Sequence, residues 1–260
     1  MSLNKYQIAI FLLYAIASIL VIFSVGVIVY PYLAAAGSIS QVIFEIESTR
    51  ILSALFLSIT SSIATTILAI IFGIPLAYIF AMVEFRGKDL IETLSIDIPQ
   101  TFPPIAEGMI FLLLLGPSSP IGLNLSFTFI ALVISKFFIA APFIVSFVCR
   151  RFKEIKKSGL DLTARTLGAN KFQVFWTVLL PLSYKEIIAG SALCWSRAMG
   201  ELGGSLLFAG VIPGVTETIP TFVANEAHTL TSAALAATIL ATASSTLALL
   251  YFKRTMKRDD

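Results

Sequence analysis

Four ionisable side chains interrupt the apolar runs of this sequence and are the first candidates for chemistry. They are Glu107, Lys136, Arg197 and Glu201. An Arg, Lys or Asp at the centre of a membrane costs roughly 2.5–3.5 kcal/mol on insertion scales, so such groups pair or serve a substrate path. Arg197 and Glu201 stand four residues apart and share one helix face, whereas Glu107 and Lys136 could pair between helices. We expect helix-to-helix ion pairs rather than direct substrate contact, with Glu201 orienting Arg197 rather than facing a pore.

No catalytic or metal-binding cluster accompanies these residues. The sequence has no Walker A, G-x-S-x-G, H-E-x-x-H or C-x-x-C pattern. Cys149 and Cys194 are far apart, and the single histidine, His228, is expected to be solvated rather than a ligand. We therefore expect no catalytic residues, no metal and no cofactor bound by this chain. A membrane-embedded enzyme would need a cluster that is not found.

The composition predicts an all-α integral membrane protein. Of the 260 residues, 57% are hydrophobic and 13% are charged, whereas a soluble domain carries about 25% charge. A spanning helix needs about 20 mostly apolar residues. This predicts one transmembrane domain, residues 1–260, with about six spans near 7–30, 51–83, 98–115, 127–148, 187–211 and 229–252. The first span should end at Pro31 and remain as an anchor, because its apolar run is too long for a cleaved signal peptide.

Two short segments and the distribution of basic residues complete the predicted topology. A short amphipathic piece lies at 40–49, and small residues recur every four positions in the last span, at Ala233, Ala237, Ala241 and Ser245. Packing within the chain explains that stripe more simply than a dimer seam. Fifteen of the 18 Lys and Arg residues fall on one side if the N-terminus is cytoplasmic, with Arg50 alone near the outer side. The positive-inside rule then predicts cytoplasmic termini and a cytoplasmic 150–185 loop.

Within that loop, residues 158–181 read as two short helices joined at Gly168. Ser158 can cap the first helix with Asp161 in the capping-box position, and Asn170 can cap the second with Gln173. Gly168 supplies the left-handed residue between them. The side chains expected to form one apolar face of the second helix, which Pro181 stops, are Phe172, Phe175, Trp176 and Leu179. On the first helix Leu160, Ala164 and Leu167 share one side, shaped to enter a groove on another protein.

This loop resembles the cytoplasmic coupling loop of ABC importer permeases. That family carries Glu-Ala-Ala, three residues, Gly, then roughly a dozen residues to Leu-Pro; here Leu162-Thr163-Ala164, Gly168 and Leu180-Pro181 match it. The acidic position is lost to Leu162, although Asp161 is adjacent. The resemblance implies ATPase-coupling residues Asp161, Leu162, Thr163, Ala164, Arg165, Leu167, Gly168 and Ala169. The alternative is an amphipathic loop lying on the membrane.

Two further stretches carry the same resemblance. Phe72-Gly73-Ile74-Pro75-Leu76-Ala77-Tyr78 is similar to the Gly-x-Pro-Leu-Ala-Tyr signature of these permeases. Gly200-Glu201-Leu202-Gly203 and the run 209–220, Ala-Gly-Val-Ile-Pro-Gly-Val-Thr-Glu-Thr-Ile-Pro, resemble the molybdate and tungstate branch. Sulfate permeases share the first of these two patterns and fit the second less well.

The run 98–108 contains Pro99, Pro103 and Pro104, which cannot all sit in regular helix. Broken backbone at membrane depth is tolerated only against protein or a water-filled cavity. We expect a pathway wall or gate here, Thr101 in particular, or else an ordinary entry turn. The candidates for pathway or gate are Pro99, Thr101, Pro103, Pro104, Arg197 and Glu201. Glu107 stands where the resemblance leads us to expect a small residue.

The resemblance also implies an assembly. It implies a plasma-membrane homodimer with the pathway between the copies, two ATP-binding cassette subunits that carry ATP and Mg, and an external solute-binding protein. Transport would proceed by alternating access, and no nucleic acid is involved. The alternatives are a permease for sulfate or another small solute, or a stand-alone secondary transporter. The last would want an internal repeat and charged midplane sites, and no clear repeat is visible.

Overall fold

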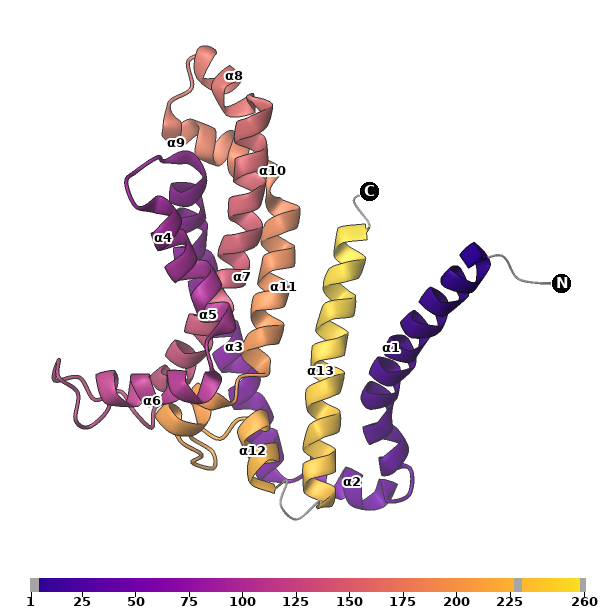
Figure 1. Ribbon diagram of the computed structural model, residues 1–260. Coiled ribbons are helices and arrows are strands. Elements are labelled where there is room, and N and C mark those ends of the chain that lie inside the picture. Colours follow the sequence, from indigo (N-terminus) through magenta and orange to yellow (C-terminus); the bar gives the residue numbers. More distant parts are fainter. Residues whose placement is uncertain (1–4, 227–230, 258–260) are drawn as a thin grey trace.

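The computed structural model describes residues 5–226 and 231–257, and the regular elements among them are all helices, with no strand (Figure 1). The elements are α1 (Lys5–Ala35), α2 (Ile39–Ile46), α3 (Thr49–Met82), α4 (Lys88–Glu92), the π-helical turn η1 (Thr93–Asp97), α5 (Ile98–Thr101), α6 (Pro104–Leu115), α7 (Phe129–Ser158), α8 (Leu160–Thr166), α9 (Lys171–Val174), the π-helical turn η2 (Phe175–Leu179), α10 (Leu180–Leu182), α11 (Tyr184–Met199), the π-helical turn η3 (Ser205–Ala209), α12 (Ile219–Glu226) and α13 (Ser232–Lys257). The predicted fold class, an all-α membrane protein, is confirmed.

The core is the packing of α3, α7 and α11. The buried side of α3 is built of small residues: Ala54, Ser58, Ser61, Ser62, Thr65, Ala69, Gly73 and Ala77. Small residues let membrane helices approach closely, which matters where lipid gives no hydrophobic drive between helices. A Cβ atom on Gly73 would lie 3.2 Å from Val145 of α7, and one on Gly190 of α11 would lie 3.0 Å from the Cα atom of Ile144.

The first and last long helices stand outside this core. Most of the described side chains of α1 are exposed, and Tyr32 Oη joins α1 to Thr242 Oγ1 of α13 at 2.9 Å. Ala236 and Ala237 of α13 are buried in a cluster with Val42 of α2 and Phe222 of α12. Ala233 and Ala241 pack against the same cluster, so this part of the small-residue stripe packs within the chain, as predicted.

Three of the described helices are long and apolar enough to cross a membrane, within α1, α3 and α7. A fourth crossing exists if the bent pair Lys88–Thr101 and Pro104–Leu115 counts as one. The segment predicted as a span at 98–115 is bent by 115° at its prolines, where broken helix was expected.

Three helices end at other residues than the predicted spans do. The first helix passes through Pro31 to Ala35, since a membrane helix tolerates a proline when its freed backbone group finds another partner. The fourth predicted span continues to Ser158 and carries its basic end beyond the apolar part. The helix predicted at 187–211 stops at Met199, where glycines 200, 203 and 204 end the regular helix.

We predict that Gly190→Ala destabilises the protein by about 1–3 kcal/mol, because the new methyl group overpacks against the α7 backbone. Gly26→Ala is the matched control, since a Cβ atom there meets nothing within 4 Å on exposed α1. Thermal unfolding in detergent should show Gly26→Ala unchanged or slightly more stable. Equal changes in stability for the two substitutions would contradict the close packing of α11 against α7.

Candidate coupling surface and buried polar groups

The helix α8 is set between two left-handed glycines at one end of the molecule (Figure 1). Gly159 has φ +76° and ends α7, and Gly168 has φ +95° after the last turn of α8. Gly159, rather than Ser158, is the N-cap of α8, so that predicted cap is wrong. Ser158 is the last residue of α7, and its hydroxyl donates to the Ile155 carbonyl at 2.8 Å.

The second half of the loop begins as predicted and then changes register. The Asn170 N–H donates to Gln173 Oε1 at 2.8 Å and the Gln173 N–H donates to Asn170 Oδ1 at 2.9 Å, so the capping box is confirmed. The π-helical turn η2 then rotates the following side chains: Phe172 is 72% exposed whereas Leu179 is 1% exposed. The predicted single apolar face is therefore wrong.

Pro181 does not stop this run, because the helix continues to Leu182. Proline occupies the first turn of α10, where its missing N–H removes no hydrogen bond of that short helix. The predicted end at Pro181 is therefore wrong, and the helix ends at its C-cap Ser183 instead.

Apolar side chains project from α8 and its C-terminal end. Leu162 is 59% exposed and Leu167 is 85% exposed, while Ala164 is half-buried against the core. An exposed apolar set on a protruding helix is typical of a surface that docks into a partner. The predicted coupling residues thus lie together on one short helix and its C-terminal turn: Asp161, Leu162, Thr163, Ala164, Arg165, Leu167, Gly168 and Ala169.

Side-chain contacts connect this surface to the ends of α3 and α7. The ring of Phe175 packs edge-on against Tyr78 of α3 at 5.4 Å and against Phe152 of α7 at 6.3 Å. Lys156 Nζ donates to the Ala81 carbonyl at 3.2 Å and to Glu84 Oε1 at 3.0 Å. The Lys156 ammonium, with that of Lys88, lowers the pKa of the Glu84 carboxyl. Because α8 packs against α7 and η2, a displacement of α8 reaches α7 directly and α3 through Phe175 and Lys156.

The proline-rich run forms a bend that packs against glycines. Pro99 is buried in α5, and the exposed Thr101 hydroxyl donates back to the Asp97 and Ile98 carbonyls at 3.2 and 3.1 Å. Pro103 and Pro104 stand at the break before α6. A Cβ atom on Gly203 would lie 2.3 Å from the Pro104 carbonyl, so backbone meets backbone at this bend. Pro104, one of the predicted gate candidates, is thereby brought next to Gly203.

Arg197 and Glu201 form the predicted pair, with NH1 of Arg197 3.3 Å from Oε2 of Glu201. The Glu201 carboxylate is fully buried and also accepts the Gly204 N–H at 2.8 Å. Arg197 remains about one-third exposed. The carboxylate is therefore fixed by backbone and can orient the guanidinium.

Glu107 and Lys136 do not pair, so that expectation is wrong. Lys136 Nζ donates to the Ser58 carbonyl, Ser61 Oγ and Ser62 Oγ, at 3.3, 2.7 and 3.1 Å. Adjacent residues on a helix point about 100° apart. Ser135 faces Gly204, so its neighbour Lys136 faces α3 instead of Glu107.

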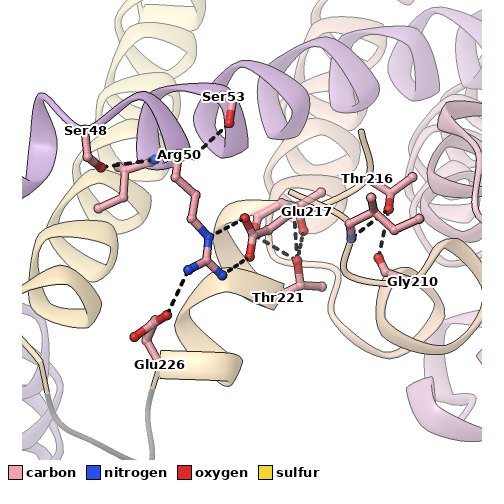
Figure 2. Close-up of polar contacts among 11 residues, drawn as sticks. Ser48, Arg50, Ser53, Gly210, Thr216, Glu217, Thr221 and Glu226 are labelled. Atoms are coloured by element: carbon pink, nitrogen blue, oxygen red, sulfur yellow. Dashed lines mark hydrogen bonds and ion pairs between the residues drawn. The ribbon is translucent and has the colours of Figure 1, made fainter. Parts of the chain in front are cut away.

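An ion network at the opposite end of the molecule was missed from the sequence (Figure 2). Arg50, in the first turn of α3, binds Glu217 with Nε at 2.9 Å and NH2 at 2.6 Å, and its NH1 lies 3.1 Å from Glu226. Its guanidinium also lies over the Phe222 ring, 4.9 Å from the centroid. The available signal was Arg50 itself, the single basic residue on the predicted outer side. His228 lies outside the described residues.

The sequence matches the family described as binding-protein-dependent transport system inner membrane component over residues 73–258. It is 31% identical over 193 residues to a probable molybdenum ABC transporter permease protein of Haloferax volcanii, covering 71% of each chain. It is 32% identical over 197 residues to the molybdenum transport system permease protein ModB of Mycobacterium tuberculosis, covering 72% of this chain and 73% of that protein. The molybdate/tungstate transport system permease protein WtpB of Thermococcus kodakarensis is 26% identical over 199 residues, with 76% and 77% covered.

The fold is also found in a solved transporter. The crystal structure of a bacterial ABC transporter involved in the import of the acidic polysaccharide alginate contains a chain that aligns with a TM-score of 0.69. The alignment covers 95% of this chain and 96% of that chain at 17% identity. At this identity the likeness establishes the shared fold.

We predict that Glu217→Gln lowers the free energy of unfolding by about 1–3 kcal/mol, because it leaves the Arg50 guanidinium without its buried counter-charge. Glu154→Gln is the control, since Glu154 pairs with Arg151 in a largely exposed position worth at most about 1 kcal/mol. Denaturation curves of the purified variants measure both. Equal stabilities for the two would mean that the Arg50 network contributes little.

Proposed function

This chain belongs to the family of binding-protein-dependent transport system inner membrane components, and we propose that it forms the pathway of an importer for molybdate or tungstate. It is a multi-pass permease component of the inner membrane and not the ATPase subunit. The oxyanion assignment is supported by relatives named as molybdenum or molybdate/tungstate permeases. We infer that a separate solute-binding protein selects between the two anions.

The observation that carries the mechanism is the exposed apolar helix α8 between its two left-handed glycines. In the proposal, α8 sits in a groove of an ATP-binding cassette subunit, with ATP and Mg in that subunit. Closure of two such subunits moves α8 as a lever. It packs against η2 and the end of α7. Phe175 of η2 and Lys156 of α7 then pass the movement on to α3. Two copies of this chain would enclose the pathway, which then opens alternately to the two sides.

The proposal also fixes an orientation. The α8 end of the molecule is the end at which α1 begins and α13 finishes (Figure 1). Placing α8 in the cytoplasm puts both termini there and puts the Arg50 network on the outer side. The external binding protein would dock on that outer side.

We predict that Gly168→Pro abolishes both ATPase association and oxyanion uptake, because proline cannot adopt φ +95° and cannot donate the N–H that Gly168 gives to the Arg165 carbonyl. Co-purification of the ATPase subunit and radiolabelled molybdate uptake measure the two effects.

Gly122→Pro is a closely matched control for this substitution. Gly122 has φ +73°, its N–H donates to the Ser119 carbonyl, and a Cβ atom there meets nothing within 4 Å. It lies in the loop between α6 and α7, well away from α8. The Gly122→Pro protein should keep the ATPase bound. Retention of the ATPase by Gly168→Pro, or its loss from both variants, would count against the coupling role of α8.

We predict that Arg197→Met lowers stability by about 1–3 kcal/mol, because it leaves the buried Glu201 carboxylate unpaired. Adding Glu201→Gln should restore stability, since the buried charge is then gone, but not uptake. Thermal unfolding and molybdate uptake of the single and double variants separate the two roles. Wild-type uptake by the double variant would remove Arg197 from the pathway.

A further inference from the structure

We propose that Glu107 is a proton-binding site, occupied when α6 is packed against η3 and emptied when these two elements separate. The proposal concerns the seam between α6 and the 203–209 segment. It goes beyond the transported anion and the ATPase, because neither is needed for the proton to bind. Nothing in the transport of an oxyanion by itself calls for a carboxyl group at this place.

The geometry of the seam leaves Glu107 no room and no partner. The side chain is 1% exposed, and neither carboxyl oxygen has a hydrogen-bond partner within the described part of the chain. A Cβ atom on Gly108 would lie 2.6 Å from the Gly203 carbonyl oxygen. One on Gly204 would lie 2.8 Å from Ser135 Oγ and 3.2 Å from Glu107 Oε1. The glycines thus bring backbone up to the carboxyl group and close it off.

Among the residues that the structure describes, the charged groups facing this carboxyl group are engaged elsewhere or carry the same sign. Lys136 of α7 donates to three oxygen atoms of α3. Arg197 of α11 pairs with Glu201. Glu201 itself, the remaining group, is a second buried carboxylate that repels a negative charge on Glu107.

The neutral acid is therefore the form of Glu107 that fits the closed seam. An ionised carboxylate buried without a partner is far more costly than a neutral one. The N-terminal turn of α6, in which Glu107 lies, favours negative charge only weakly by comparison. When α6 moves away from η3, water reaches the carboxyl group, which ionises as an ordinary exposed glutamate does at neutral pH.

Linkage then fixes the sign of the pH effect. The closed seam binds one more proton per chain than the open seam, so acid favours the closed arrangement and alkali favours the open one. One proton changes the equilibrium by at most tenfold per pH unit. The pH dependence of seam opening is present in the pH range where Glu107 is ionised in the open seam and still protonated in the closed seam.

Infrared spectroscopy of the purified full-length protein at pH 7 tests the occupied site directly. We expect the carbonyl stretching band of a protonated carboxylic acid, shifted by ¹³C labelling of glutamate carboxyl groups. The band should be lost in Glu107→Gln and retained in Glu201→Gln and in Glu84→Gln, whose carboxyl group is exposed and ion-paired. A wild-type spectrum without such a band, a band that ignores the label, or one that survives in Glu107→Gln overturns the proposal.

Thiol labelling tests the coupling to seam opening. Ser205 of η3 is fully buried, and its hydroxyl has no hydrogen-bond partner among the described residues. Ser205→Cys, made with Cys149→Ser and Cys194→Ser, therefore reports opening with little disturbance. The labelling rate is measured with Glu107 present and with Glu107→Gln, and the ratio of the two rates cancels the titration of the thiol itself.

We expect the labelling rate with Glu107 present, divided by the rate with Glu107→Gln, to rise between pH 6 and pH 8 by up to tenfold per pH unit. A ratio independent of pH overturns the coupling. Neither measurement involves molybdate or the ATPase, so their failure leaves the proposed transport function standing, and loss of uptake in other variants leaves the proton site standing.

Discussion

The close approach of α3 to α7 is the constraint on which the other sites depend. In lipid, helices are held together by packing and interhelical hydrogen bonds rather than by the hydrophobic effect. The small residues of α3 permit that packing, and its hydroxyl groups supply the bonds, with Lys136 of α7 held by Ser61 and Ser62. The far end of α7 carries Lys156 and then α8, so the position of the coupling surface is set by this one interface.

The two irregular segments, the proline bend and the glycine segment, lie against each other within this frame. Proline at 103 and 104 and glycine at 203 and 204 break two helices side by side, and each break fills the space that the other leaves. Non-helical backbone at membrane depth is tolerated only against protein or water. The bend and the glycine segment therefore require each other, although they are about a hundred residues apart in the chain.

The sequence predicts what is local and misses what depends on a partner in space. The Asn170 capping box, the left-handed Gly168 and the Arg197–Glu201 pair follow from spacing of three or four residues, and all form. The π-helical turn η2 could not be expected, because its register is set by packing of Phe175 between α3 and α7. The partners of Lys136 depend on the direction in which its side of α7 faces. A single residue more or less before it would turn the side chain by about 100° toward other partners.

Helix α3 also holds the segment 210–226 in the same frame. Arg50, in its first turn, holds Glu217 and Glu226 (Figure 2). Two turns further on, Ser58 Oγ accepts the Ile219 N–H at 2.8 Å. The Ser58 carbonyl accepts Lys136 Nζ at the same turn, so one residue joins α12 to α7 through α3. Thr216 holds the rest of the segment in shape, since its hydroxyl donates to the Gly210 carbonyl and accepts the Ile212 N–H. The run of residues that resembles oxyanion permeases is thus fixed to α3, whose other end is joined to η2 and α7 by Phe175 and Lys156. Because α8 packs against η2 and α7, a push on α8 has a path of packed and hydrogen-bonded groups to the segment 210–226.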